Sequence, residues 1–292
     1  MSRAASDQPE DRRHARHMVA PAVVVLGLVA VYPICAAVWL SLHRAILIFR
    51  ERRFVGVDNY GALLGDDRFW ASLGHTLYFT LVAVSLEVAL GLSFALLLSN
   101  VARGRGVMTA AVLVPWAIPT VVAAKTWHWL YDADVGLVAR ALPFDDVDLL
   151  GMPGWAMHAA ILVDVWKTTP FVALLLYAGL STIPADLYKA AAIDGAGRFA
   201  TFARITLPSL RSTLGVAALL RALDAFRVFD AVYVLTEGGP ANTTETLSIY
   251  AYKTLMRAGD FGYGSTLAVA TFVSLGLLAA ALWLAIGRGA AR

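Results

Sequence analysis

The sequence contains few charged residues and a single cysteine. Charged side chains make up 15% of the 292 residues, whereas hydrophobic side chains make up 59%. A soluble domain of this size would carry more charge. The lone Cys35 excludes an intrachain disulfide. The basic residues are scattered along the chain and the net charge is only +3, so no nucleic-acid-binding patch is indicated.

Signatures of nucleotide and metal chemistry are also missing. The chain has no phosphate-binding loop of the GxxxxGKS/T type. His128 has no second candidate ligand nearby in the sequence, so no metal site is predicted. Any ATP hydrolysis linked to this chain is therefore expected on another chain, and this chain is not expected to be an enzyme.

Apolar runs of membrane-spanning length recur along the chain. Each is long enough to cross a hydrocarbon core of about 30 Å as a helix. Helices are expected because lipid satisfies no backbone polar groups. The prolines at 115 and 119 predict that the third run is bent or broken. We therefore predict an all-α membrane protein of six transmembrane helices, with spans at residues 18–43, 75–99, 107–131, 156–180, 210–236 and 264–287.

The distribution of basic residues predicts how these helices are oriented across the membrane. The polar tail at 1–17 is rich in Arg and precedes a run that is too long for a signal-peptide core. The positive-inside rule places this tail and the C-terminus in the cytoplasm. The Arg-rich segment 44–74 falls outside in this orientation and weakens the bias. The predicted organisation is thus a cytoplasmic tail at 1–17 and a transmembrane domain at 18–292, with a cytoplasmic loop at about 181–209.

The cytoplasmic loop contains a polar segment with two turn signals. Residues 194–196, Asp-Gly-Ala, predict a helix end or a sharp turn, because Asp bonds locally and Gly tolerates positive φ. Phe199, Phe202 and Ile205 then recur at roughly helical spacing, and Pro208 is typical of a helix start. From spacing alone, an ordinary loop with an amphipathic helix explains the segment equally well.

Two predicted spans carry charges near their middle. In the fourth span, Asp164 and Lys167 are three residues apart, so they can share a helix face and neutralise each other. The fifth span carries a series of alternating charge at Arg221, Asp224, Arg227 and Asp230. Charges inside a membrane are costly and usually face a cavity or a partner. The series either forms salt bridges that merely neutralise one another or lines a water-filled path. The water-filled path is favoured, because apolar residues at these four positions would stabilise a spanning helix as well as the charges do.

The segment from residue 188 to 208 resembles the coupling-loop signature of importer-type ABC transporter permeases, which are multi-spanning subunits that work in pairs. In that family the loop forms short helices that fit a cleft on the cytoplasmic ATPase subunit. Lys189 departs from the family pattern, which usually has Glu there, and a lysine cannot act as an anion. The resemblance assigns coupling to the ATPase to Lys189, Ala190, Ala191, Asp194, Gly195, Ala196, Phe199 and Pro208.

The strings VWKTTPF and LDAFRVFD resemble trehalose-importing members of the maltose-type permeases. The resemblance implies an ABC-importer permease (type I) fold and a sugar, such as trehalose or maltose, contacted from the fourth and fifth spans. The implied substrate path consists of Asp164, Lys167, Thr168, Phe171, Arg221, Asp224, Ala225 and Val228.

The same resemblance implies a larger assembly in the cell membrane. Its expected members are this subunit, a second homologous permease, two ATP-binding-cassette ATPase subunits and an extracytoplasmic solute-binding protein. ATP with Mg²⁺ is expected on the ATPase subunits, and no cofactor is expected on this chain.

Two other functions stay open at the level of sequence. A proton-coupled secondary transporter could use Glu87, Asp164 or Asp224 as a proton relay, although the chain shows no internal repeat of the kind common in such transporters. A membrane scaffold that transports nothing would have no reason to keep charges inside its spans.

Overall fold

The computed structural model describes residues 9–101, 103–141 and 148–290, and most of them are helical. The expected tail at 1–17 is therefore described only from residue 9, and residues 1–8 lie outside the described part. The chain forms two units. The smaller contains residues 1–65 and 251–270, and the larger contains residues 66–250 and 271–292.

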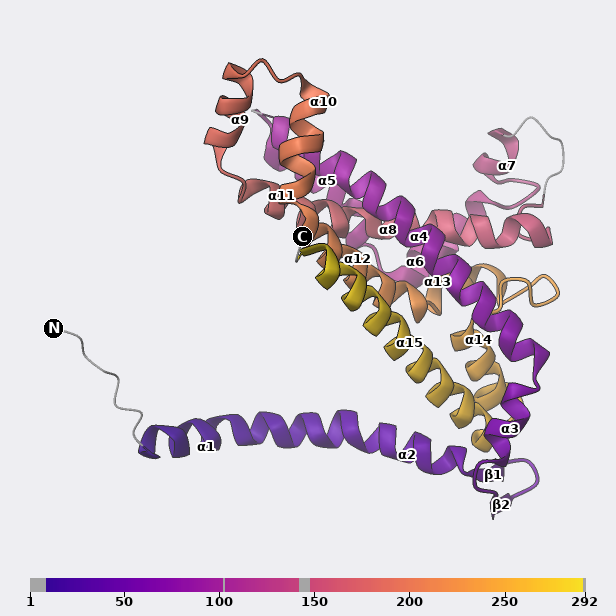
Figure 1. The fold of residues 1–292 in the computed structure, drawn as a ribbon. Coiled ribbons are helices and arrows are strands. Elements are labelled where there is room, and N and C mark those ends of the chain that lie inside the picture. The colour runs from indigo at the N-terminus through magenta and orange to yellow at the C-terminus, as the bar shows by residue number, and fades with distance from the viewer. Residues whose placement is uncertain (1–8, 102, 142–147, 291–292) are drawn as a thin grey trace. The chain divides into compact units, whose positions relative to one another are not determined.

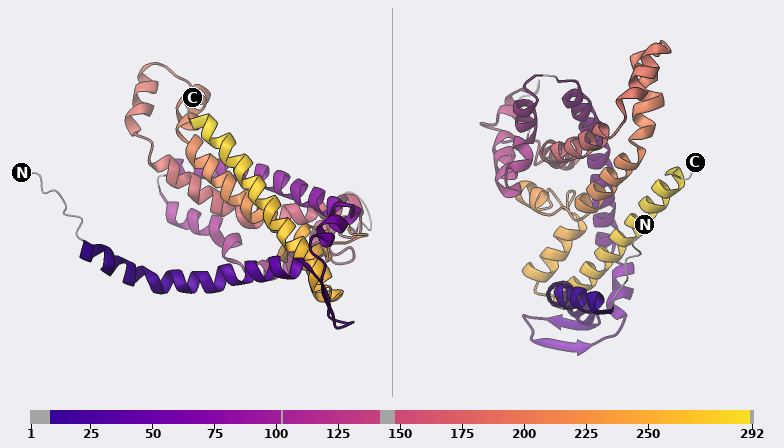
Figure 2. Two further views of the ribbon diagram at one scale, coloured as in Figure 1. Left: turned by 60° about the horizontal axis from the view of Figure 1, so that its bottom comes forward. Right: turned by 90° about the vertical axis from the view of Figure 1, so that its left-hand side faces the viewer.

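The smaller unit begins with a long helical rod (Figure 2). In it, α1 (Pro9–Leu26) continues through a π-helical turn, Gly27–Val31, into α2 (Tyr32–Ser41). Pro33 has no amide N–H and its ring clashes with the carbonyl of the preceding turn, and the wider π-helical turn directly before it accommodates both effects. The apolar part of the rod, Met18–Ser41, corresponds to the first predicted span.

A β-hairpin follows the rod, although no strand was predicted there. Strand β1 (His43–Ile46) pairs antiparallel with β2 (Glu51–Phe54). The side-chain amide of Asn59 donates to the backbone carbonyls of Ser41 and His43, at 2.8 and 3.0 Å, and so fixes the start of the hairpin against the end of the rod. The unit also contains α3 (Asp58–Leu64), a π-helical turn at Lys253–Arg257 and the first part of α15 (Phe261–Ala290).

The larger unit is built around two long helices, α4 (Asp67–Asn100) and α8 (Pro153–Ser181), which pack along each other (Figure 1). Small side chains such as Ala83 and Ala160 allow close contact, and Phe79 and Leu176 fill the core around them. The other elements of this unit are α5 (Arg105–Ala117), α6 (Thr120–Leu130), α7 (Leu137–Ala141), α9 (Ala185–Ile193), α10 (Arg198–Thr201), a π-helical turn at Phe202–Thr206, α11 (Leu207–Ser209), α12 (Arg211–Phe226), α13 (Asp230–Thr236) and the start of α14 (Leu247–Tyr252).

The predicted membrane class is confirmed, whereas the number of crossings is not settled. Four described helical stretches are long and apolar enough to cross a membrane: Met18–Ser41, Asp67–Asn100, Pro153–Ser181 and Phe261–Ile286. Together, α5 and α6 would form a fifth. The span expected at 210–236 is not one helix, because α12 ends at Phe226 and α13 starts at Asp230. Six crossings therefore stay a prediction.

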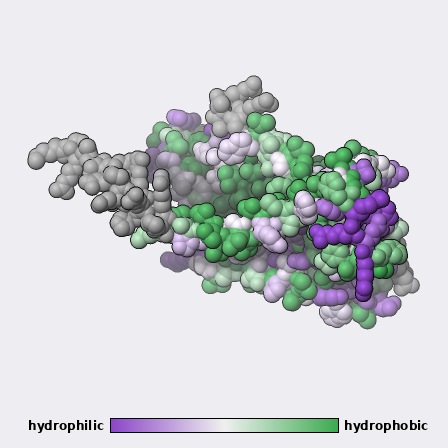
Figure 3. Space-filling model, turned by 90° about the horizontal axis from the view of Figure 1, so that it is seen from below, coloured by the Kyte–Doolittle hydropathy of each residue, from purple (hydrophilic) through white to green (hydrophobic). Residues whose placement is uncertain are grey.

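The surface agrees with a lipid environment. Apolar side chains cover much of the face seen in Figure 3, and exposed apolar surface on this scale is typical of membrane or protein contact. Exposed charge is found on the β1–β2 hairpin, which carries Arg52 and Arg53.

Gly91 sets the distance between α4 and α8, and this yields a prediction about stability. A Cβ atom on Gly91 would lie 2.6 Å from Val172 Cγ1 and 3.2 Å from the backbone nitrogen of Ala173. We expect Gly91→Ala to destabilise the protein by about 1–3 kcal/mol, as overpacking does. Thermal unfolding of the detergent-solubilised protein measures this loss. Gly74→Ala is the control, since Gly74 lies on the same helix and an added Cβ meets nothing within 4 Å. Equal unfolding midpoints for the two variants would contradict the close approach.

Candidate functional site

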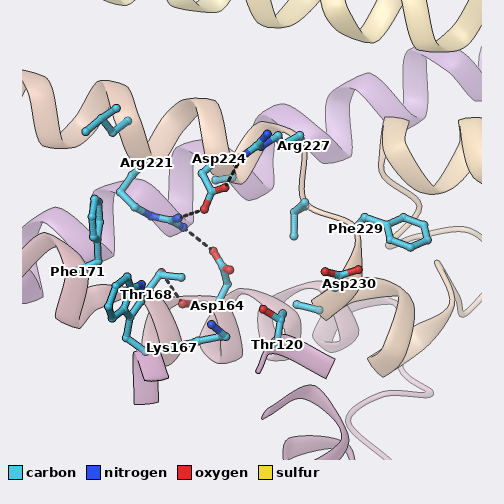
Figure 4. Close-up of a pocket in the computed structure, with 15 residues that line it drawn as sticks. Thr120, Asp164, Lys167, Thr168, Phe171, Arg221, Asp224, Arg227, Phe229 and Asp230 are labelled. Atoms are coloured by element: carbon cyan, nitrogen blue, oxygen red, sulfur yellow. Dashed lines mark hydrogen bonds and ion pairs between the residues drawn. The ribbon is translucent and has the colours of Figure 1, made fainter. Parts of the chain in front are cut away.

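The larger unit contains a cavity of about 550 Å³ bordered by α5, α6, α8, α12, the start of α13 and the link between α12 and α13 (Figure 4). All eight residues of the predicted substrate path lie on its wall: Asp164, Lys167, Thr168, Phe171, Arg221, Asp224, Ala225 and Val228. The wall also contains residues that were not assigned to the path: Trp116, Thr120, Leu220, Arg227, Phe229, Asp230 and Ala231. The structure thus brings the predicted set together, and its contact with a transported molecule stays a prediction.

One wall of the cavity is shaped by the break between α5 and α6. The two helices are bent by 87°, which confirms the predicted bend. Pro119 precedes α6 directly, and the residue before a proline is driven out of the helical region. Ile118 accordingly has a ψ of 132°. The break leaves Trp116 and Thr120 on either side of the corner, and both side chains line the cavity.

A second break lies between α12 and α13. The charge series predicted for one spanning helix is therefore split: Arg221 and Asp224 lie on α12, whereas Asp230 starts α13. Phe229 has φ −136° and ψ −65°, outside the helical region. An acidic residue in the first turn of a helix is favoured by the helix dipole. This preference supports a helix start at Asp230, which the even spacing of the charges did not reveal.

Arg221 is the centre of the charged cluster in this site. Its side chain is 4% exposed and its guanidinium contacts carboxylates on three helices. Nε and Nη2 donate to the two oxygens of Glu87 on α4, at 2.6 and 2.9 Å. Nη2 also donates to Asp164 on α8 at 3.0 Å, and Nη1 donates to Asp224 on α12 itself (Figure 4). Arg227 adds a more exposed bond to Asp224 at 3.2 Å.

These contacts change two expectations about the charges. Asp164 pairs with Arg221, and no ion pair between Asp164 and Lys167 is found among the described residues. The intrahelical bonds from Arg221 and Arg227 to Asp224 do exist, but the buried bonds of Arg221 join different helices. The cluster therefore does more than neutralise charge within one helix.

Glu87 is the member of this cluster that the predicted substrate path lacks. It is fully buried and lies behind the cavity wall. The signal available in the sequence was a carboxylate near the middle of the second apolar run, opposite a basic residue near the middle of the fifth. Apolar periodicity alone does not identify which helices are neighbours, so the pairing was not predictable from it.

The predicted turn at residues 194–196 closes the end of α9. Asp194 is the C-cap and Gly195 has a φ of 72°, in the left-handed region. Gly195 N–H donates to the carbonyl of Ala192 at 3.2 Å, and Ala196 N–H donates to that of Ala191 at 2.9 Å. These two bonds form a Schellman motif, which satisfies the last carbonyls of the helix. The helix end expected from the sequence is confirmed.

The helices around this turn form a projecting tip. Figure 2 (right) shows α9 and α10 extending past the other helices of the larger unit. Ile193 and Phe199 are both more than four-fifths exposed there. Lys189 pairs with Asp186 one turn earlier, at 2.9 Å, a partner that was not predicted. Pro208 lies in the first turn of α11, as expected.

Comparison with known proteins places this geometry in context. Residues 87–289 match the family model described as "Binding-protein-dependent transport system inner membrane component". The chain is 46% identical over 274 residues to the trehalose/maltose transport system permease protein MalF of Thermococcus litoralis, which covers 93% of this chain and 92% of that relative. It is 39% identical over 270 residues to the trehalose transport system permease protein SugA of Mycobacterium tuberculosis, covering 92% of this chain and 87% of that one.

The fold also has a solved counterpart. The crystal structure of a bacterial ABC transporter involved in the import of the acidic polysaccharide alginate matches with a TM-score of 0.83 over 96% of each chain. The sequence identity is 20%, so the likeness bears on the fold alone.

The charged cluster predicts that Arg221 and Arg227 differ sharply in their effect on stability. Arg221→Met removes the cation that the buried Glu87 and Asp164 share, so we expect a loss of about 3–5 kcal/mol, typical of a buried charge left unpaired. Arg227→Gln breaks an ion pair whose side chains are 70% and 54% exposed, and such pairs contribute about 0–1 kcal/mol. Yield and unfolding temperature of the purified protein report both effects. Similar losses for the two variants would show that the Arg221 cluster is not a stabilising centre.

Proposed function

Because this chain belongs to the family of binding-protein-dependent transport system inner membrane components, we propose that it is the permease subunit of an ATP-binding-cassette sugar importer and that the Arg221 cavity is the sugar path. The observation that carries the proposal is this cavity, in which charged and aromatic side chains meet within a unit built from membrane-spanning helices. Its volume lies within the roughly 300–1,000 Å³ of small-molecule sites.

The chemistry of the wall suits a neutral polyol. Carboxylates accept hydrogen bonds from sugar hydroxyls, and guanidinium and ammonium groups donate to them, in bonds that charge makes stronger. Trp116 and Phe171 stack with ring centroids 6.0 Å apart and add an apolar surface at one end. A disaccharide such as trehalose or maltose is our proposed substrate, since relatives that share most of this chain carry those names.

The proposed complex contains four further kinds of component. They are a second homologous permease, a pair of ATP-binding-cassette ATPase subunits, an extracytoplasmic solute-binding protein and the sugar. This chain binds no cofactor in the proposal, because ATP and Mg²⁺ bind to the ATPase subunits. Residues 18–292 act as one permease domain in the inner membrane, with residues 1–17 and the C-terminus in the cytoplasm.

The projecting tip is the proposed contact with the ATPase. In this orientation the loop at about 181–209 is cytoplasmic, and its exposed Ile193 and Phe199 are suited to an apolar cleft. Lys189 is already paired with Asp186. The firmer contact to the ATPase therefore falls to Asp194 or to the second permease.

The transport proposal predicts sugar uptake that depends on ATP. In proteoliposomes containing the whole complex, we expect labelled trehalose or maltose to accumulate only with the binding protein outside and ATP inside. An uncoupler should leave uptake unchanged at a fixed ATP concentration. Uptake that an uncoupler abolishes while ATP is constant would instead favour a proton-coupled transporter.

The coupling proposal predicts a specific effect of Gly195. A β-branched residue at φ 72° is strained, so Gly195→Val should open the Schellman motif and displace the tip. We expect normal membrane insertion but at least a tenfold lower ATP hydrolysis in response to the loaded binding protein. Gly197→Val is the matched control, since Gly197 has φ −67° and ψ 163° and an added Cβ meets nothing within 4 Å. Wild-type transport by Gly195→Val would rule out the loop as the coupling element.

A further inference from the structure

Glu87 contacts the cavity only through other residues. Its side chain is fully buried on α4, and it is not part of the cavity wall. It nevertheless bonds to two residues that are on the wall, Arg221 on α12 and Thr168 on α8. A carboxylate in this position determines how those two side chains are presented to whatever occupies the cavity.

The contact with Arg221 fixes the plane of a guanidinium. Nε and Nη2 bind the two oxygens of Glu87 in a bidentate pair, and such a fork permits one relative orientation of the two groups. The second hydrogen on Nη2 then reaches Asp164, and one of the two hydrogens on Nη1 reaches Asp224. These bonds use four of the five guanidinium hydrogens, and the second hydrogen on Nη1 is the one left to donate into the cavity. Without Glu87, the Arg221 guanidinium could turn out of this plane while it keeps its bonds to Asp164 and Asp224.

Glu87 is one of two acceptors that the protein offers to the Thr168 hydroxyl. Thr168 Oγ1 lies 2.7 Å from Glu87 Oε1 and 2.7 Å from the backbone carbonyl of Asp164. Both neighbours accept hydrogen bonds, and a hydroxyl has only one hydrogen to donate. That hydrogen is therefore held by the protein, and Thr168 has only lone pairs left for the cavity. The partner at this position must be a donor, such as a sugar hydroxyl.

We propose that Glu87 is a positioning residue of the sugar path, which aims the Arg221 guanidinium as a donor and presents the Thr168 hydroxyl as an acceptor. The inference rests on the proposed transport of a sugar through this cavity. It differs from a purely structural role in one measurable way. A structural ion pair affects assembly and every activity together, whereas a positioning residue affects sugar passage more than ATP hydrolysis.

The test uses the complete reconstituted transporter with its binding protein and trehalose or maltose as the probe. Uptake of the sugar and ATP hydrolysis stimulated by the loaded binding protein are measured on the same vesicles, and the readout is sugar transported per ATP hydrolysed. The variants are Glu87→Gln, the charge exchange Glu87→Arg with Arg221→Glu, and Thr168→Val. The control is Thr80→Val, a buried position on α4 whose hydroxyl bonds only within its own helix and which lies away from the cavity wall.

Glu87→Gln offers the guanidinium one acceptor and one amide N–H in place of two acceptors, so it breaks the fork while keeping the shape. We expect sugar per ATP to fall at least tenfold in Glu87→Gln, with stimulated hydrolysis within about twofold of wild type. The charge exchange places a carboxylate at position 221 beside Asp164 and Asp224, so we expect it to restore neither assembly nor sugar per ATP where the single changes lose them. Thr168→Val should lower the ratio at least threefold with assembly unchanged, and Thr80→Val should leave it at the wild-type value.

Three results would overturn the inference. The first is a wild-type ratio in an assembled Glu87→Gln complex. The second is a parallel loss of yield, hydrolysis and uptake that the charge exchange repairs in full. The third is a wild-type ratio in Thr168→Val, which decides the matter where the Glu87 variants fail to assemble. Failure of the transport proposal itself is distinguishable, because the wild-type complex would then take up no sugar with ATP.

Discussion

The contact between Arg221 and Glu87 is the interaction on which the larger unit depends. It joins α12 to α4, and through Asp164 it also joins α8, so three helices meet at one guanidinium. A buried cation facing several carboxylates is costly to desolvate, and replacing the whole cluster, cation and carboxylates together, with apolar side chains would serve stability as well. The proposed sugar path gives this cation a role beyond stability, because Arg221 lines the cavity. The same bonds that hold the helices together decide which donors and acceptors face the interior.

The local features of the site were predictable from the sequence. Pro119 predicted the bend before α6, the Asp-Gly-Ala turn predicted the end of α9, and the positions of Asp164 and Arg221 predicted a shared cavity. These features are encoded within a few residues, either by backbone chemistry or by depth along a span. The membrane class followed in the same way from the length of the apolar runs.

What the sequence did not reveal depends on tertiary neighbours. The pairing of Glu87 with Arg221 joins residues 134 positions apart, and no periodicity identifies such a partner. The interruption between α12 and α13 was not predictable from the charge pattern, because charged residues continue at helical spacing from one helix to the next. The pair of Lys189 with Asp186 is a local exception, because an interval of three residues brings the two side chains together on one helix face.

The two helix breaks have a consequence for the energy of an empty cavity. Both border it, through Trp116 and Thr120 on one side and Arg227 to Asp230 on the other. Interrupted helices leave amide groups without intrahelical partners, and lipid offers none, so such backbone is tolerated where protein or water can solvate it. The backbone at both breaks therefore requires polar groups or water in the cavity beside it. In the proposed transport, an entering sugar would exchange its hydrogen bonds to water for hydrogen bonds to these groups, which lowers the barrier to its passage.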